Sequence, residues 1–338
     1  MQDYSFTELS PEDFEAFVFT QKCNNFLQSR EMFNRYQANN REAYLVGVVK
    51  DHQTIAAALV MKLQSIKGRK VFSTPGGPIL DYEAKDSSKV LRYFFKELST
   101  FLKAHSGSVL QVSPNVLYSE ELTKTLESLS FKNLGEYIQA KWITARGFEG
   151  IKSEDELLAE LRTTHRQNVR KTINRYKLEI RELKKDELGI LFNEVNKAAA
   201  KHDFVAQDQS YYEEMFDAFG DKIKVLAAYY EGKPICAAMF VIYGNEVVYL
   251  YSGSDPEYSK IYGPYALQWH MLCYCLKNHI PRYNFFGTYP VEENGVYQFK
   301  LGFRGKLEEL QGTFMLPLDI LGKLYVARKK YHKYGELS

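Results

Sequence analysis

Cysteine is scarce in this sequence, and the few cysteines are irregularly spaced. The 338 residues include only Cys23, Cys236, Cys273 and Cys275. Four cysteines in such a pattern do not make the disulfide framework of a small secreted protein, so we interpret them as small buried residues. Cys273 and Cys275 are not followed by a second pair of cysteines or histidines, and the sequence therefore predicts no metal site.

Long hydrophobic runs and an excess of charge of one sign are also missing. The longest apolar run, residues 55–61, is far shorter than the roughly 20 residues of a membrane-spanning helix. Residues 1–13 are polar and acidic, unlike a secretory signal peptide, so we expect a cytoplasmic protein. Because 44 basic and 42 acidic side chains leave a net charge of only +2, the sequence does not indicate a general nucleic-acid-binding protein.

Aromatic residues, by contrast, are abundant. The chain has 25 tyrosines and 22 phenylalanines, whose flat faces and hydrogen-bonding edges suit sugars, bases and peptides as well as protein cores. Hydrophobic residues make up 45% and charged residues 25% of the chain, as in ordinary folded proteins. A chain of 338 residues exceeds what one core usually fills, and we therefore expect two domains.

Two distant segments share one pattern, which predicts an internal duplication. Residues 48–61 and 228–241 each contain an extended run, a short polar turn and a second run with small residues at its centre, the pattern of a β-hairpin. The same order follows both hairpins: a third strand (70–73 and 246–252), a long helix (88–105 and 264–278) and a further strand (109–112 and 282–286).

This order predicts an α/β fold with mixed sheets in two tandem lobes. We expect the first lobe to span residues 1–147 and the second, which carries the active site, to span residues 148–317. Ligands tend to bind where the strands of such a sheet part near a crossover helix. A last basic helix, residues 318–338, is expected to pack back on the first lobe; the alternative is contact with a membrane surface.

Positive charge is concentrated in residues 162–177, which contain no acidic side chain. Arg162, Arg166 and Arg170 recur at every fourth position, so on a helix they form one basic edge. Such an edge suits phosphate groups, either of a nucleotide or of an RNA backbone. The alternative is a solvated helix face paired with nearby acidic residues. His165 falls on the apolar side of this helix, and we expect it to be a hydrogen-bonded core residue.

Residues 259–269 predict the start of a helix at the cleft of the second lobe. Gly263 allows close backbone approach and Pro264 fits the first helical turn, so free N–H groups would face the cleft. The acetyl-CoA N-acyltransferases bind pyrophosphate at this location with the pattern R/Q-x-x-G-x-G/A. Lys260, Gly263 and Tyr265 stand at these three positions here, and the bulky Tyr265 replaces the expected small residue.

The stretch GVYQFKLGFRG, residues 295–305, places a lysine among aromatic side chains. Lys300 stands among Tyr297, Phe299 and Phe303 in a pattern that is neither a clean amphipathic helix nor a clean alternating strand. The lysine is either a cation that acts in an aromatic pocket or a side chain that covers aromatic surface while its ammonium group stays in water.

Six segments, in order and correctly spaced, are similar to the motifs of one family. They are FLQSREM (26–32), GGPILDY (76–82), TTHRQNVRKT (163–172), YLYSGSD (249–255), YGPYALQW (262–269) and YQFKLGF (297–303). Together they resemble the Fem-type aminoacyltransferases, which build peptidoglycan interpeptide bridges and consist of two acetyltransferase-like lobes. Only about ten residues separate Tyr211 from the strand predicted at Ile223, so the chain resembles the compact branch without a coiled-coil arm.

The resemblance implies roles for individual residues. Lys300 corresponds to the lysine credited with stabilising a tetrahedral oxyanion, and Phe299 stands beside it. Tyr211 and Tyr251 correspond to tyrosines that contact the nucleotide-linked precursor.

Two positions depart from the family pattern. Gln207 stands where the family has a phosphate-binding arginine, four residues before the first tyrosine. A lysine expected shortly after the Gln-Ser of the first lobe is missing, and Arg35 is the nearby candidate. The candidate substrate-binding residues are therefore Tyr211, Tyr251, Gln207, Arg35, Arg166, Arg170 and Gly263.

The resemblance also implies a reaction. Family members move an amino acid from aminoacyl-tRNA to an amine on the stem peptide of a peptidoglycan precursor, UDP-linked or lipid-linked, without a metal or organic cofactor. Such a reaction takes place in the cytoplasm or at the inner face of the membrane. Two alternatives stay open: an acyl-CoA-dependent N-acyltransferase that uses acetyl-CoA at the Gly263 loop, and a non-catalytic protein that binds a sugar nucleotide.

Overall fold

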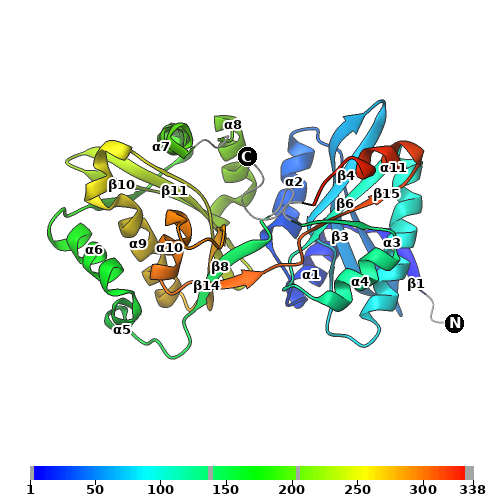
Figure 1. Cartoon of the computed structure of the whole chain (residues 1–338), viewed down its shortest axis with the longest axis horizontal. Helices are drawn as coiled ribbons and strands as arrows, with labels where there is room; N and C mark the ends of the chain where they lie inside the picture. Colours follow the sequence, from blue (N-terminus) through cyan, green and yellow to red (C-terminus); the bar gives the residue numbers. More distant parts are fainter. Residues whose placement is uncertain (1–3, 136–139, 203–205, 332–338) are drawn as a thin grey trace. The chain divides into compact units, whose positions relative to one another are not determined.

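A computed structural model describes residues 4–135, 140–202 and 206–331. The chain forms two compact units (Figure 1). The first unit combines Met1–Lys141 with Glu309–Leu337, and the second unit is Trp142–Glu308.

The first unit is built on a mixed sheet with the strand order β1-β2-β3-β4-β6-β15-β7, to which β5 adds by pairing with β3. Its strands are β1 (Tyr4–Glu8), β2 (Ala43–Lys50), β3 (Gln53–Ile66), β4 (Arg69–Gly76), β5 (Ile79–Leu80), β6 (Gly107–Pro114), β7 (Lys132–Gly135) and β15 (Thr313–Pro317). Its helices are α1 (Pro11–Thr20), η1 (Phe26–Gln28), α2 (Arg30–Ala38), α3 (Ser87–Ala104), α4 (Glu120–Ser128) and α11 (Ile320–Ala327).

The second unit has a mixed sheet with the order β14-β8-β13-β12-β11-β10-β9. Its strands are β8 (Trp142–Gly147), β9 (Glu179–Glu182), β10 (Ile223–Tyr230), β11 (Lys233–Tyr243), β12 (Glu246–Ser254), β13 (Arg282–Gly287) and β14 (Lys306–Glu309). Its helices are α5 (Glu154–Glu160), α6 (Thr163–Asn174), η2 (Lys185–Glu187), α7 (Leu188–His202), α8 (Gln209–Phe219), η3 (Gly220–Lys222), η4 (Pro256–Ile261), α9 (Gly263–Lys277) and α10 (Gly295–Gly302).

The predicted α/β fold with a duplicated lobe is confirmed. The hairpins β2–β3 and β10–β11 are antiparallel, and each is closed by a two-residue loop. Asp51 and His52 have φ angles of 49° and 64°, and Glu231 and Gly232 have φ angles of 49° and 77°. Two consecutive left-handed residues are the type I′ turn that suits the right-handed twist of a hairpin, so both lobes use the same turn.

The units divide the chain at other positions than the expected 1–147 and 148–317. Strand β8 follows β7 in the sequence but pairs with β13, so it belongs to the second sheet. Strand β15 follows β14 but pairs with β6 and β7, so it belongs to the first sheet. The boundaries therefore lie at Lys141 and Glu309, because distant pairing decides which sheet a strand joins.

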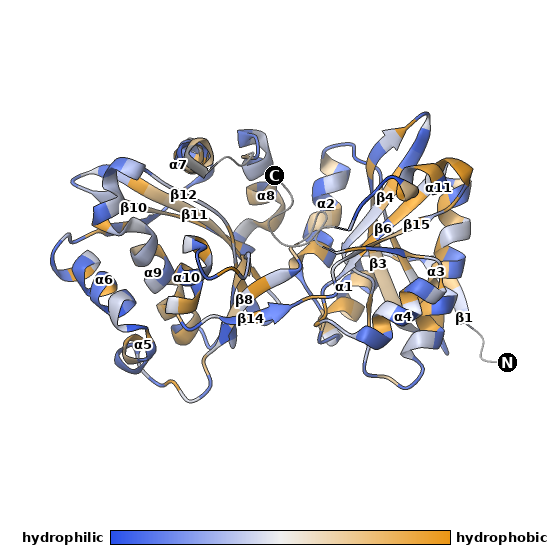
Figure 2. Ribbon diagram, viewed as in Figure 1, coloured by the Kyte–Doolittle hydropathy of each residue, from blue (hydrophilic) through white to orange (hydrophobic). Residues whose placement is uncertain are grey.

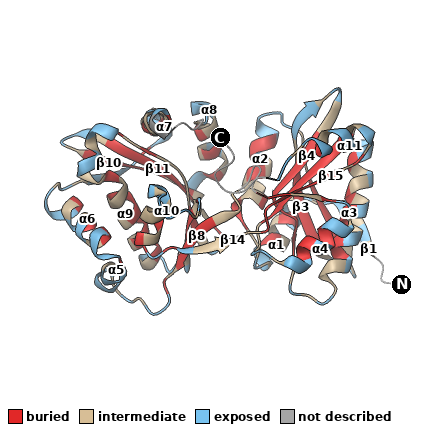
Figure 3. Ribbon diagram, viewed as in Figure 1, coloured by how far each residue is buried: buried red, intermediate tan, exposed pale blue. Residues whose placement is uncertain are grey.

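Each unit has its own hydrophobic core between its sheet and its helices. Phe72, Phe94 and Phe314 are fully buried in the first unit, and Phe240 and Phe285 in the second. Apolar residues and buried residues coincide along the central strands of both sheets (Figures 2 and 3).

The interpretation of the cysteines as buried residues holds for two of them. Cys236 and Cys275 are buried, whereas Cys23 and Cys273 are half-buried. Cys23 lies at the edge of the first core, where its Sγ donates to the Leu80 carbonyl at 3.3 Å.

The parallel strands of the second sheet separate part-way along their length. Strands β12 and β13 are paired only from Glu246–Val248 to Arg282–Asn284. Beyond that point, the register of β12 against β11 shifts between Met239 and Phe240, and the pairing of β13 with β8 is irregular after Asn284. Such bulges bend strands, and here they open a gap in the sheet.

Candidate active site

A cavity of about 690 Å³ lies in the second unit where β12 and β13 part. The lining residues include Tyr251 and Asp255 at the end of β12, Gly263 and Tyr265 at the start of α9, and Phe299 and Lys300 on α10. Tyrosines and phenylalanines dominate its wall. The cavity can therefore hold a flat or apolar group beside a few polar atoms.

Lys300 lies on a short helix, although its sequence pattern suggested neither a clean helix nor a clean strand. The side chain of Asn294 accepts a hydrogen bond from the Tyr297 N–H at 2.9 Å and so caps the first turn of α10. Lys300 is in the last turn and only 5% exposed, and it lines the cavity. Its ammonium group does not reach open solvent, so the snorkelling alternative does not describe it.

The ammonium group of Lys300 is held by backbone oxygens. Its Nζ donates to the carbonyl of Phe286 at 3.3 Å and to that of Gly287. Within the described residues the structure pairs no carboxylate with Lys300, and burial alone lowers the pKa of its ammonium group from 10.5 to about 7. The site therefore contains a buried amine that carries its proton easily only below neutral pH.

The bend of β13 places the carbonyl groups that hold Lys300. Phe286 has a φ of 61°, a left-handed conformation that is uncommon for a bulky residue. The side-chain oxygen of Asn284 accepts from the Phe286 N–H at 2.8 Å and so supports this turn. The strained residue lies at the cavity wall, where strain of this kind is most often found.

His165 of α6 holds the end of α10. It is 6% exposed, and its Nε2 lies 3.0 Å from the Phe299 carbonyl oxygen. Burial lowers the pKa of His165, so the neutral ring donates from Nε2. A Cβ atom on Gly302 would lie 1.9 Å from the imidazole, so glycine is required there. The expected hydrogen-bonded core histidine is thus confirmed, and it also positions the helix that carries Lys300.

The two tyrosines implied by the resemblance contact each other, and Tyr251 of the pair lines the cavity. The hydroxyl of Tyr251 donates to that of Tyr211 at 3.1 Å, and their rings lie edge to face with centroids 5.5 Å apart. Tyr212 packs against Tyr251 at the same centroid distance and is fully buried; desolvation raises its pKa to about 12. Tyr211 of α8 thus supports the hydroxyl group of Tyr251, whereas the residues that line the cavity do not include Tyr211 itself.

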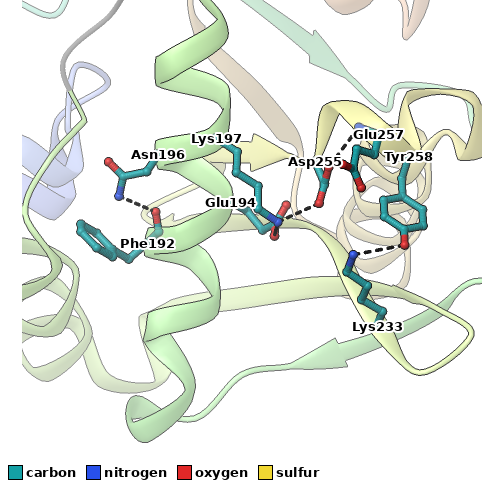
Figure 4. Close-up of polar contacts among 8 residues, drawn as sticks. All are labelled: Phe192, Glu194, Asn196, Lys197, Lys233, Asp255, Glu257 and Tyr258. Carbon is teal, nitrogen blue, oxygen red and sulfur yellow. Dashed lines mark hydrogen bonds and ion pairs between the residues drawn. The ribbon is translucent and has the colours of Figure 1, made fainter.

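A charged network ties α7 to the end of β12 (Figure 4). Lys197 forms ion pairs with Glu194 at 2.7 Å and with Asp255 at 2.8 Å. Burial raises the pKa of Glu194. The α7 backbone passes so close to β12 that a Cβ on Gly253 would lie 2.1 Å from the Glu194 carbonyl oxygen. The network fixes the strand end that lines the cavity.

Sequence reasoning did not assign roles to the residues of this network. Asp255 ends the motif YLYSGSD, and its Oδ1 accepts from the Glu257 N–H at 3.0 Å, which caps η4. An aspartate directly before a proline at the end of a strand is a usable signal for such a cap. Glu194 and Lys197, three residues apart on one helix, carry no comparable signal because this spacing is common on exposed helices.

Gly263 lies where the sequence placed it, at the first position of α9 and in the wall of the cavity. A Cβ at this position would lie 2.8 Å from the Cβ of Cys236, so the glycine also allows α9 to approach β11. Tyr265 follows it and packs edge to face on Phe299 at 5.0 Å. The space that a small residue would leave next to the helix start is therefore filled by an aromatic ring.

The predicted basic residues do not line the cavity. Helix α6 begins at Thr163, so Arg162 precedes it, and the Arg162 guanidinium donates to Gln298 on α10 at 3.0 Å. Arg166 donates to the Ala159 carbonyl at 2.9 Å, and Arg170 is exposed. The basic edge is thus formed by two arginines of the helix rather than three.

The other two candidates lie elsewhere. Gln207 precedes α8 and is exposed. Arg35 lies on α2 in the first unit and is only 4% exposed. Roles for both in substrate binding stay predictions.

Residues 4–135, 140–202 and 206–331 contain neither a cluster of metal-ligand side chains nor a helix suited to cross a membrane. Within these ranges no three His, Cys, Asp or Glu side chains are close enough to hold a metal ion. In the same part of the chain, no helix combines the length and the apolar character that a bilayer crossing requires.

A family model and the sequences of known proteins match this chain over most of its length. The model of the FemAB family matches residues 9–233 and 227–330. The chain is 27% identical to the aminoacyltransferase FemB of Staphylococcus epidermidis, over 93% of this chain and 95% of that protein. It is 24% identical to the aminoacyltransferase FemA of the same species (strain ATCC 35984), over 97% of this chain and 100% of that protein.

Solved structures share the fold at lower identity. A crystal structure of FemX has a TM-score of 0.82 and 17% identity, covering 96% of this chain and 100% of that chain. A tandem GNAT protein from the clavulanic acid biosynthesis pathway has a TM-score of 0.60 and 8% identity, covering 94% and 99%. The two units are therefore tandem GNAT-like, that is acetyltransferase-like, lobes.

Proposed function

This chain belongs to the FemAB family, and from that premise we propose that its second unit moves an aminoacyl group from aminoacyl-tRNA to an amine of a peptidoglycan precursor. The protein is an aminoacyltransferase, as its curated relatives FemB and FemA are. The donor, the acceptor and the residues of the site belong to the proposal.

The observation that carries the proposal is Lys300, a buried amine with no carboxylate partner among the described residues, at the wall of an aromatic cavity. In aminolysis of an ester, the acceptor amine attacks the carbonyl carbon and the carbonyl oxygen becomes an oxyanion. The C–O bond to the ribose then breaks, and the amine proton passes to the leaving oxygen through solvent or a site group. A protonated lysine in a water-poor cavity stabilises this oxyanion far more than it would in water.

Phe299 has a supporting part in this reaction. It lines the cavity beside Lys300, and its carbonyl group is the acceptor for His165. The ring keeps water from the ammonium group, and the carbonyl anchors the helix. The activated ester supplies the free energy of transfer, so the proposed reaction needs neither a metal nor an organic cofactor.

The remaining candidates are assigned to substrate binding. The hydroxyl groups of Tyr211 and Tyr251 suit the polar atoms of a precursor, and the N–H groups at Gly263 suit an anionic group. Arg166 and Arg170 suit phosphates of the RNA backbone. Gln207 suits a precursor phosphate as a hydrogen-bond donor. A substrate-binding role for Arg35, which is buried in the first unit, stays a prediction from the resemblance.

The proposal places the reaction in the cytoplasm, because its aminoacyl-tRNA donor is an intracellular molecule. With a lipid-linked acceptor the reaction takes place at the inner face of the membrane.

The test is single-turnover transfer of a radiolabelled amino acid from charged tRNA. The purified chain is mixed with total aminoacylated tRNA and with either a UDP-linked muropeptide or its lipid-linked form, and product is resolved from free amino acid. Labelled acetyl-CoA with the same acceptors forms the comparison arm. Transfer from tRNA supports the proposal; transfer from acetyl-CoA alone overturns it and favours the acyl-CoA reading.

A further inference from the structure

The C-terminal helix α11 buries one face and exposes another. Val326 packs in a cluster with Val71, Val109 and Met315 of the first sheet. A Cβ on Gly322 would lie 2.0 Å from the Ser108 carbonyl oxygen, so the helix rests directly on β6. The opposite face holds Ile320, which is 79% exposed, and Leu324, which is 57% exposed. Packing on the sheet therefore explains only half of this helix.

The exposed aliphatic pair forms one contiguous spot. Ile320 and Leu324 are four residues apart, so their side chains are neighbours on one helix face. Figure 2 colours much of α11 as hydrophobic, and Figure 3 shows exposed stretches on the same helix. Exposed aliphatic neighbours on an anchored helix are a common mark of an interaction surface.

The β3–β4 hairpin lies beside α11. The Gln64 amide donates to the Tyr325 hydroxyl at 2.7 Å, and Ile66 packs on the cluster that contains Val326. Arg69 of the hairpin forms an ion pair with Asp319, the N-cap of α11, at 3.1 Å. The hairpin and the helix are thus one surface, which we call the α11 surface and define as residues 62–70 and 320–331.

The α11 surface is basic throughout. Its two segments contain no aspartate or glutamate. They contain Lys62, Lys67, Arg69, Lys70, Lys323, Arg328, Lys329 and Lys330. Arg69 and Lys70 pair with Asp319 and Glu42. In the described part of the chain no carboxylate forms an ion pair with the exposed Lys67, Lys323, Arg328 or Lys330. A chain with a net charge of only +2 therefore concentrates unpaired positive charge around an exposed aliphatic pair.

We propose that the α11 surface binds the headgroup region of an anionic lipid membrane. Aliphatic side chains enter the boundary between headgroups and acyl chains, while lysines and arginines stay with the anionic headgroups. An RNA backbone would satisfy the charges but offers no partner for the aliphatic Ile320 and Leu324. Charge and apolar character together therefore favour lipid.

The binding should be weak and reversible. One short helix with two aliphatic side chains does not anchor a protein by itself, and stable association requires a second signal such as a basic patch. Both signals are present on this surface. The inference goes beyond the transfer reaction, because it rests on the first unit alone and does not require the proposed chemistry of the second.

The experiment is co-sedimentation of the full chain with vesicles, in the absence of any substrate. Vesicles of phosphatidylcholine are compared with vesicles that also contain phosphatidylglycerol. We expect binding only to the mixed vesicles and weaker binding as salt increases. The double change Lys323→Gln with Arg328→Gln should lower the partition coefficient about 25-fold, since each basic residue near an anionic surface contributes about fivefold.

The aliphatic pair is tested by Ile320→Ser with Leu324→Ser, which should lower partitioning at least tenfold. The matched control is Ile173→Ser, an aliphatic residue that is 51% exposed on the basic helix α6; it should leave partitioning unchanged. Because all of these side chains are exposed, thermal unfolding should match that of the parent protein.

Three results would overturn the inference. The first is equal binding of the parent chain to both kinds of vesicle. The second is an equal loss with Ile173→Ser, which would make the effect unspecific. The third is loss of affinity for uncharged tRNA without loss of vesicle binding in the α11 variants, which would assign the surface to RNA. Transfer to a soluble UDP-linked acceptor, measured in the same variants, reports separately on the proposed function.

Discussion

The two units contain the same pair of parallel strands, but only the second unit separates them. In the first unit, β4 and β6 stay paired from Lys70–Gly76 to Gly107–Pro114. In the second, β12 and β13 are paired over Glu246–Val248 only, and the rest of β12 lines a cavity. The same lobe thus exists in a closed and an open form within one chain.

Buried amides fill the place in the first unit where β3 and β4 stop pairing, beyond Met61 and Ser73. Gln28 is fully buried, and its amide donates to the Pro75 carbonyl at 2.7 Å and to the Leu59 carbonyl at 3.1 Å. Its side-chain oxygen accepts from the Leu59 N–H at 2.7 Å. Asn25 donates to the Gly76 carbonyl at 3.0 Å. A Cβ on Gly77 would lie 2.7 Å from the Gln28 side chain, so the segments FLQSREM and GGPILDY meet at the end of β4. We call the buried Asn25 and Gln28 the plug of the first unit.

The difference teaches where each unit uses its polar residues. In the first unit, buried amide side chains form hydrogen bonds with backbone groups that would otherwise have no partner at the strand ends. The second unit leaves the strand end to a cavity and holds a lysine there on two carbonyl groups. Duplication supplies the scaffold twice, and the early end of the β12–β13 pairing leaves room for a cavity in one copy.

The largest expected effect comes from Lys300→Met. This change keeps the length of the side chain and removes the cation, so single-turnover transfer should fall about 100-fold to 1000-fold. Binding of the acceptor should change little, because the interaction forms only in the transition state. The melting temperature should change little, because the loss of an ammonium group buried without a counter-ion offsets the loss of its hydrogen bonds to two carbonyl groups.

The matched control is Lys141→Met in the first unit. The Lys141 side chain is 12% exposed and paired with Glu309 at 2.8 Å. Its loss should lower the free energy of unfolding by about 1 to 3 kcal/mol without changing the rate per folded molecule. Near-normal turnover in Lys300→Met would remove the central residue of the proposed mechanism.

The second prediction concerns the plug of the first unit. Gln28→Ala leaves the Leu59 N–H and two carbonyl groups without partners, so the free energy of unfolding should fall by about 3 kcal/mol. Denaturant unfolding measures the loss. Gln37→Ala is the control, since this glutamine makes a single 3.3 Å hydrogen bond to the Ala43 carbonyl; it should cost about 0.5 kcal/mol. Equal losses would mean that Gln28 contributes no more to stability than a glutamine with one ordinary hydrogen bond.

The third prediction concerns His165, which holds α10 in the second unit through the Phe299 carbonyl group. His165→Ala removes the donor to the Phe299 carbonyl, and kcat should fall about tenfold because Lys300 is less well placed. KM should hardly change. His165→Asn keeps a donor and should restore part of the rate, whereas a purely structural role would lower stability in both variants alike. A tenfold rise in KM at constant kcat would contradict the positioning role.

Much of the fold follows from local sequence patterns. Both hairpins carry a two-residue polar turn between extended runs, and a crossover helix follows in the same order in each lobe. Lys300, Tyr211 and Tyr251 were identified by the resemblance to family motifs, and not from hydrophobic patterns or charge. The sequence did not show that Tyr251 and Lys300 line one cavity or that Tyr211 contacts Tyr251, because α8, β12 and α10 are far apart along the chain.

Other features left no local signal. The exchange of β8 and β15 between sheets depends on partners more than a hundred residues away. The parting of β12 and β13 depends on bulges, and the left-handed Phe286 replaces the glycine that would announce such a turn. The contact between His165 and α10 left one local signal, Gly302, because a glycine within a helix often marks the close approach of a neighbouring group.

The smallest expected effect is a pH dependence that only the open unit should produce. The pKa of Lys300 is lowered to about 7 because its ammonium group is buried. The cation is therefore present below this pKa and is lost as the pH rises through it. If Lys300 acts as the cation, its charged fraction and the rate it supports should fall roughly threefold from about pH 6.5 to about pH 7.5.

The measurement compares the parent protein with Lys300→Arg at each pH. Arginine stays charged over this range but places its charge differently. The variant should therefore be slower than the parent, and its rate should not show the fall near pH 7 that deprotonation of Lys300 causes. Dividing the parent's single-turnover rate by that of Lys300→Arg cancels the ionisation of the acceptor amine, which is common to both. The ratio should fall with pH if Lys300 stabilises the oxyanion. A ratio that rises with pH would instead make neutral Lys300 a proton acceptor for the attacking amine.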